Sequence, residues 1–171
     1  FSGSSASRTV TITPTANLFG SATITVTVTD SGGLTASDSF VLTVNSVADT
    51  PSVTNATTNE DSQTTSGLVI SRNAADGNEV THFKVTGITN GTLYQNDGTT
   101  AIVNNSFITF AQANAGLKFT PSTNFFGTGS FTIQASTSAS DAGLGGSTVN
   151  ATITVNSVAD TPSVTNSTTN E

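Results

Sequence analysis

The chain of 171 residues has no Cys, no Met and no Trp, a single His, and only four Lys and Arg residues. Without Cys there are no disulfides, thiolate nucleophiles or zinc–thiolate sites, and one His provides neither a two-His metal site nor a dependable proton shuttle. Four scattered basic residues cannot neutralise a series of phosphates, so nucleic-acid binding is excluded and anionic membrane surfaces are disfavoured. We therefore expect no enzymatic activity.

Hydroxyl side chains are abundant instead, with 35 Thr and 23 Ser. Charged residues make up 9% of the chain, and eleven of them are acidic, which gives a net charge of -7. No apolar run is long enough to predict a membrane-spanning helix. Phe1 does not open a signal peptide, and we expect the sequence to be a piece of a longer protein.

A segment of 17 residues occurs twice. Val44–Glu60 reads VNSVADTPSVTNATTNE and Val155–Glu171 reads VNSVADTPSVTNSTTNE, with 16 identical positions and starting points 111 residues apart. A second pair is TITPTANLFG at Thr11–Gly20 and KFTPSTNFFG at Lys118–Gly127. A period of this length is the size of one β-sandwich domain. The sequence therefore predicts the C-terminal part of one repeat (1–47), one complete repeat (48–157) and the start of the next (158–171).

Apolar and polar residues alternate along several segments, which is typical of half-buried β-strands. The longest reads ATITVTVT from Ala22 to Thr29. Further strands are predicted at Phe40–Val44, Leu68–Ile70, Phe83–Val85, Leu117–Phe119, Phe131–Ala135 and Val149–Val155. Turns are predicted at Asn90-Gly91, Asp97-Gly98 and Gly143–Gly146, and one helical turn at Ala111–Ala115.

About seven strands in one repeat predict an all-β fold, an antiparallel Greek-key β-sandwich of immunoglobulin-like type, in tandem head-to-tail repeats. Because Trp and paired Cys are absent, the packing of inward Phe residues must stabilise it. The leading fragment, 1–47, lacks partner strands, so we expect it to bury no core by itself.

The run LKFTPSTNFFG at Leu117–Gly127 is followed by a strand, an Asp-containing loop, a last strand ending in ITVN, and a VADTP linker. This order resembles the bacterial cadherin-like repeats of giant surface adhesins. The resemblance implies an extracellular protein, secreted or on the bacterial cell surface, made of many similar domains joined end to end with calcium at the joints. Its implied role is that of a spacer or stalk, with neighbouring repeats as partners.

Calcium prefers carboxylate and carbonyl oxygens. In a sandwich whose first strand runs from one pole to the other, the incoming linker and two loops meet at the N-terminal pole. This places four acidic residues together, namely Asp49, Asp76, Glu79 and Asp141. The same reasoning assigns Asp30 to the preceding fragment and Asp160 to the next joint.

The resemblance adds that Glu60 and Glu171 match a glutamate early in cadherin-like domains, and Asp76 the second acid of a D-x-D loop. Ala74 stands where that loop has its first acid, and the linker has one Asp, so we expect one calcium ion per joint. Asn45 or Asn78, main-chain carbonyls and water would complete its shell. The alternative is that these carboxylates cap turns, as we expect of Asp97.

Two other functions remain open from the sequence. The first is a module that binds glycans or another surface, for which Tyr94 is the one exposed aromatic candidate. The second is a subunit whose copies assemble laterally or by strand exchange into a filament. His82 lies on the strand face opposite Phe83 and Val85, and we expect its imidazole to be solvated or packed against a hairpin, and not catalytic.

Overall fold

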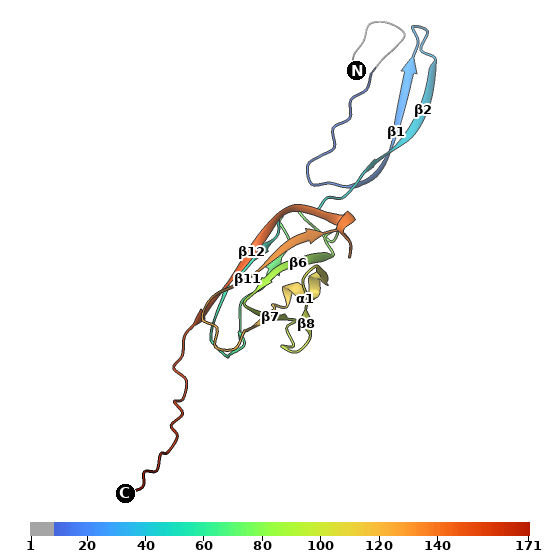
Figure 1. Cartoon of the computed structure of the whole chain (residues 1–171). Coiled ribbons are helices and arrows are strands. Elements are labelled where there is room, and N and C mark those ends of the chain that lie inside the picture. The colour runs from blue at the N-terminus through green and yellow to red at the C-terminus, as the bar shows by residue number, and fades with distance from the viewer. Residues whose placement is uncertain (1–8) are drawn as a thin grey trace.

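The computed structural model describes residues 9–171 and is an all-β molecule with several separate sheets. An N-terminal hairpin, a compact body formed by residues 48–157, and an extended tail at 158–171 follow one another along a single axis (Figure 1). Within the described part of the chain, no helix is long and apolar enough to cross a lipid bilayer.

The hairpin consists of strands β1 (Gly20–Thr29) and β2 (Thr35–Val44), which pair antiparallel along their whole length. Asp30 closes its turn, because one carboxylate oxygen accepts the main-chain N–H groups of Gly32 at 2.8 Å and Leu34 at 2.9 Å. Hydroxyl pairs bridge the strands on one face, which also carries Val41, and the other apolar residues of the two strands lie on the opposite face.

The body contains a five-stranded sheet in the order β4 (Ala56–Asn59), β12 (Leu144–Asn156), β11 (Gly127–Ser136), β6 (His82–Thr89) and β9 (Ser106–Thr109). A three-stranded sheet has the order β10 (Lys118–Pro121), β7 (Gly91–Tyr94) and β8 (Ala101–Ile102). The remaining elements are the strand pair β3 (Ser52–Val53) and β5 (Ile70–Ser71), helix α1 (Phe110–Asn114) and the 3₁₀ helix η1 (Asp141–Gly143).

One buried apolar cluster joins these sheets. Phe83 of β6, Phe119 of β10 and Phe131 of β11 are fully buried in it. Glycine provides the space for one of these rings, since a Cβ added at Gly91 or Gly129 would lie 2.4 or 2.7 Å from the Cζ atom of Phe119. The alternation predicted for β6, β10, β11 and β12 is thus confirmed.

Two predictions about the body are wrong. The pairing is not antiparallel throughout, because β4 pairs parallel with β12, from Ala56 opposite Ile153 to Asn59 opposite Asn156. Both strands run away from the end where the chain enters the body, so they point in the same direction. The Gly143–Gly146 segment is not a turn, since Leu144–Gly146 already belongs to β12.

The predicted helical turn is confirmed as α1. It begins after Thr109, whose side chain accepts the N–H of Gln112, while the Gln112 side chain accepts the N–H of Thr109. This reciprocal capping box satisfies two main-chain donors at the start of a helix.

The hairpin resembles β11 and β12 in backbone conformation, but it lacks the buried core that those strands help to form. Asn17 and Asn124 have φ angles of 61° and 54°, and Gly20 and Gly127 have φ angles of 129° and 123°, at matching positions of the two TP-containing motifs. Within residues 9–44, however, no apolar side chain is fully buried. Val28 is 63% exposed and Phe40 is 47% exposed.

Candidate functional site

The segment 45–51, called the linker below, leads from the hairpin into the body and includes its first four residues. It lies against the beginning of β12, and Ala48 is only 1% exposed. A Cβ added at Gly145 would lie 2.2 Å from the Ala48 carbonyl oxygen, and one at Gly146 would lie 2.3 Å from the Thr50 nitrogen. Glycine is therefore required at both positions for the linker to approach this closely.

Polar contacts fix the linker further. The Thr50 carbonyl accepts the Asn73 side-chain amide at 2.9 Å, and the Thr50 hydroxyl accepts the Ser147 N–H at 2.8 Å. The Asp49 N–H donates to Asp76, with the two carboxylate oxygens at 3.0 and 3.3 Å. The linker is thus bound mainly through its backbone, at what we call the entry end of the body.

The entry end brings together three of the four acids predicted there. Asp76 accepts from Asp49, and Glu79 follows in the same loop and accepts the Gly77 N–H at 2.7 Å. Burial raises the pKa of Asp76 above its ordinary value, and the negative charges of Asp49 and Glu79 raise it further, against the lowering effect of its hydrogen bonds. Asp49 and Glu79 therefore disfavour the charged form of Asp76.

Asp141 does not join this group. It lies in η1 and forms an ion pair with Lys84, at 2.6 Å between the ammonium nitrogen and the carboxylate oxygen. Within residues 9–171, no three His, Asp or Glu side chains converge closely enough to hold a metal ion. The entry end thus offers oxygen atoms of the kind that calcium prefers, and a cation would relieve their repulsion, but these acids supply only part of a coordination shell.

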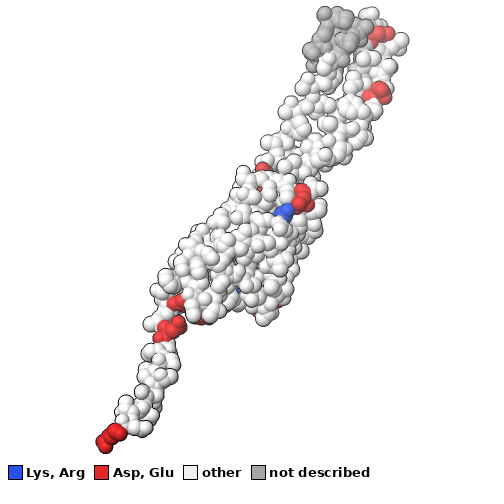
Figure 2. Space-filling model, in the orientation of Figure 1, with Lys and Arg blue, Asp and Glu red and all other residues white. Residues whose placement is uncertain are grey.

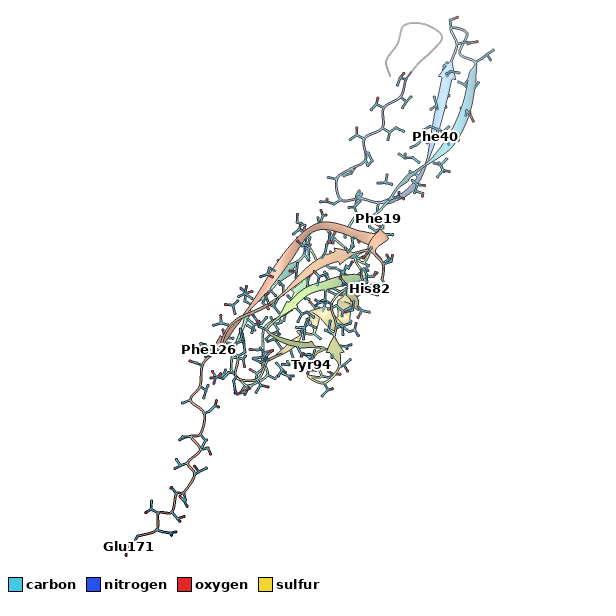
Figure 3. The ribbon with its side chains drawn as sticks, viewed as in Figure 1. Phe19, Phe40, His82, Tyr94, Phe126 and Glu171 are labelled. Carbon is cyan, nitrogen blue, oxygen red and sulfur yellow. The ribbon has the colours of Figure 1, made fainter. Side chains whose placement is uncertain are left out.

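A cavity of about 220 Å³ lies between the hairpin and the entry end. The chain before β1, the linker and the Asp76-containing loop all contribute to its wall, with Asn17, Leu18, Phe19, Asn45, Ser46, Val47, Asp49, Ala75 and Glu79. Phe19 is 54% exposed at this junction (Figure 3). At the matching position of the body, Phe126 is 64% exposed near the start of the tail (Figure 3).

Glu60 lies at the opposite end of the body, called the exit end, where β12 continues into the tail. The residue is only 8% exposed, and its N–H donates to the Asn156 carbonyl at 2.9 Å. Its carboxylate accepts the N–H of Val158, the second residue after β12. A nearly buried carboxylate is costly unless hydrogen-bonded, so Glu60 and the outgoing chain hold each other in place.

The remaining candidate residues are dispersed. Asp160 and Glu171 lie in the exposed tail, and Glu171 is at its tip (Figure 3). Asp30 caps the hairpin turn. Tyr94 is half-buried at the end of β7, on the flank of the body and away from the junction that Phe19 marks (Figure 3).

Asp97 caps a turn, as expected. Its carboxylate accepts the N–H groups of Thr99 and Thr100, both at 2.9 Å, and the Thr100 hydroxyl at 2.5 Å. The Thr100 hydroxyl and these two N–H groups lower the pKa of Asp97 to about 2. The half-buried His82 ring contacts the Thr81 hydroxyl at 2.8 Å.

Sequence reasoning missed the residues that position the linker. The turn predicted at Gly143–Gly146 includes Gly145 and Gly146, and no sequence pattern singles out Asn73. The sequence does contain a signal for these glycines, because the second repeat has GLGG where the first has a shorter turn. Additional glycines at such a position indicate a backbone conformation or a close approach that other residues do not allow. Nothing in the sequence alone indicated that Glu60 would contact the outgoing chain.

Figure 2 shows acidic groups at the hairpin tip, at both ends of the body and on the tail. The flank of the body that faces the viewer is mostly uncharged. No protein-family model matches this chain, and no curated protein matches it significantly.

Proposed function

We propose that the chain is a segment of a long extracellular adhesin or surface fibre, in which modules like residues 48–157 follow one another head to tail as spacers. In this proposal each module is a Greek-key β-sandwich of immunoglobulin or cadherin-like type. The sharing of one core by the five-stranded and three-stranded sheets supports the sandwich.

One observation carries the proposal. The linker sequence that enters the body is repeated 111 residues later where the chain leaves it, and the two copies lie at opposite ends of the body (Figure 1). A chain that enters at one end and leaves at the other, with the same joint sequence at both, extends in one direction when the unit repeats. A module of this kind sets length without needing a catalytic group.

The test is to extend the chain after Glu171 with further copies of residues 61–171, which preserves the 111-residue period. Strand β12 has 13 residues, and at about 3.3 Å per residue it spans about 40 Å. Small-angle X-ray scattering should show the maximum dimension growing by about this amount or more with each copy. A compact assembly whose maximum dimension stays constant would contradict the proposal.

Calcium at the joints is a separate part of the proposal. The position of Asp76 beside Asp49 and Glu79, whose negative charges help to raise its pKa, is what supports it. An ion that binds only the folded state stabilises it by about 2.7 kcal/mol at a hundredfold excess over its dissociation constant. We expect millimolar calcium to raise the melting temperature, and magnesium at equal ionic strength serves as the control. Identical melting in calcium and in a chelator would remove this part and leave the spacer role intact.

A further inference from the structure

The two ends of the body show two halves of one joint. Because Val158–Asp160 repeats Val47–Asp49, the outgoing chain at the exit end and the linker at the entry end are copies of the same segment. The exit end shows how the preceding module holds this segment. The entry end shows how the following module holds it.

Each half contains one carboxylate that accepts a main-chain N–H of the linker. At the exit end Glu60 accepts the N–H of Val158, and at the entry end Asp76 accepts the N–H of Asp49. In a linker with a module on each side, these two N–H groups belong to residues two positions apart. Hydrogen bonds from main-chain N–H groups to carboxylates are among the stronger ones in proteins.

We propose that the exit end of the body, around Glu60 and the Val158 N–H, is a docking surface for the entry end of a second copy of the same module, and that the joint is locked by two carboxylates, one from each module. The counterpart of Asp76 in the following copy would accept the N–H of Asp160. This inference rests on the proposed head-to-tail arrangement. It adds that hydrogen bonds made by the chain itself hold neighbouring modules together at each joint.

The contacts made at the entry end indicate which partner fits the exit end. There, Phe19 of the preceding unit lines the cavity together with Ala75 and Glu79 of the body. Phe126, at the matching position of the body, is 64% exposed at the exit end. The exit end therefore carries the same aromatic residue and the same linker sequence that contact an entry end at the first joint.

The glycines explain why a copy of this module fits and an arbitrary domain does not. Seating the linker requires Gly145 and Gly146, because a Cβ at either would overlap the linker backbone. It also requires Asn73 to donate to the Thr50 carbonyl. A partner for the tail must supply these residues in the same arrangement, which another copy does.

The first test uses the 171-residue chain and measures amide hydrogen exchange by NMR. Glu60→Ala should speed exchange of the Val158 N–H roughly tenfold or more, and leave Asp49 unchanged. Asp76→Ala should do the reverse. Glu60→Gln and Asp76→Asn, which keep a side-chain oxygen as acceptor, are the matched controls and should retain most of the protection.

The amide of Ile133 in the five-stranded sheet reports whether each variant remains folded. If an alanine variant loses this protection, the Asn or Gln variant at the same position is compared with wild type instead. Wild-type exchange of the Val158 and Asp49 N–H groups at the rate of an unprotected chain would overturn the proposal. So would Glu60→Ala and Asp76→Ala variants that are folded and exchange both groups as slowly as wild type.

The second test extends the chain after Glu171 by residues 61–171. Within the described residues of the 171-residue chain, the Asp160 N–H has no hydrogen-bond partner, and we expect its exchange to become at least tenfold slower in the extended chain. Replacing the Asp76 counterpart in the added copy by Ala should abolish the slowing.

An added copy that is folded and elongates the molecule while Asp160 remains unprotected would overturn the locked joint and leave the spacer role standing. An added copy without protected core amides would overturn both.

Discussion

Aspartate carboxylates serve different purposes at different residues of this chain. Asp97 accepts three hydrogen bonds from its own turn, and its pKa falls to about 2. Asp76 accepts the linker N–H, but burial and two neighbouring acids raise its pKa. Folding therefore favours the charged form of Asp97, whereas Asp76 binds the linker although burial and its acidic neighbours disfavour its charged form.

For Asp97 we predict a direct change in titration. Thr100→Val removes the hydroxyl that contributes most to lowering the pKa of Asp97, so the titration midpoint should rise from about 2 toward the ordinary value of 3.8. Carboxyl carbon chemical shifts measured against pH report this midpoint. Thr92→Val, an exposed strand substitution with no contact to Asp97, should leave it unchanged. A midpoint unaffected by Thr100→Val would show that the hydroxyl is unimportant.

For Asp76 the pH dependence has the opposite sign. Folding raises the pKa of Asp76, so the protonated carboxyl favours the folded state. This contribution to stability is complete below the unfolded-state pKa of 3.8 and is lost as the pH rises through the folded-state pKa. Asp76→Asn resembles the protonated form and keeps an oxygen for the Asp49 N–H. We expect it to raise the melting temperature at pH 7 by roughly 1–3 °C, and by less at pH 3.

The comparison for Asp76→Asn is Asp97→Asn, measured under the same conditions. Because the pKa of Asp97 is lowered by folding, its contribution is present at neutral pH and is lost as the pH falls from about 4 to about 2. Asp97→Asn should therefore lower the melting temperature at pH 7. If the two variants change in the same direction, the electrostatic explanation of Asp76 is wrong.

At the scale of the strands, the core of the body depends on a few aromatic rings. Phe119 is fully buried between Gly91 and Gly129, whereas Phe126, five residues after the end of β10, is 64% exposed. Phe119→Ala should lower the free energy of unfolding by about 3–5 kcal/mol. Phe126→Ala should change it by about 0.5 kcal/mol or less in the 171-residue chain. Urea denaturation measures both, and equal losses would contradict the assignment of the core.

The sequence predicts this core well because side-chain alternation depends only on which face of a strand is buried. Phe131, Ile133 and Ala135 are fully buried as their spacing indicates. Short strands such as β3 and β8, with two residues each, have too few positions for a period to be recognised. The parallel pairing of β4 with β12 depends on how distant segments meet, and local patterns contain no information about that.

The candidate site was predictable only in part for a similar reason. The shared position of Asp49 and Asp76 follows from placing the linker beside a loop at one pole, which topology alone suggests. The ion pair of Asp141 with Lys84 depends on the direction of two side chains. The contact of Glu60 with Val158 spans 98 residues and needs the parallel strand pair, which sequence reasoning did not predict.

At the scale of the whole molecule, the body and the tail differ in how well the chain is packed. The tail beyond Val158 is exposed, with Val164 at 85%, and it forms no strand in the described chain. We expect a non-specific protease such as subtilisin to remove residues 161–171 first and to leave a body that ends near Val158. Mass spectrometry of the early products gives the cleavage sites. Early cleavage within residues 68–136 would contradict this order.

The parallel pair of β4 and β12 determines how a tensile load would pass through each module. Tension applied through the linker pulls the start of β4 toward one end, and tension on the tail pulls the end of β12 toward the other. The four residue pairs from Ala56 opposite Ile153 to Asn59 opposite Asn156 are then loaded in shear, all at once and not one after another. Rupture of such a pair requires several hydrogen bonds to break together, so this short contact is where the mechanical strength of a fibre of these modules would be set.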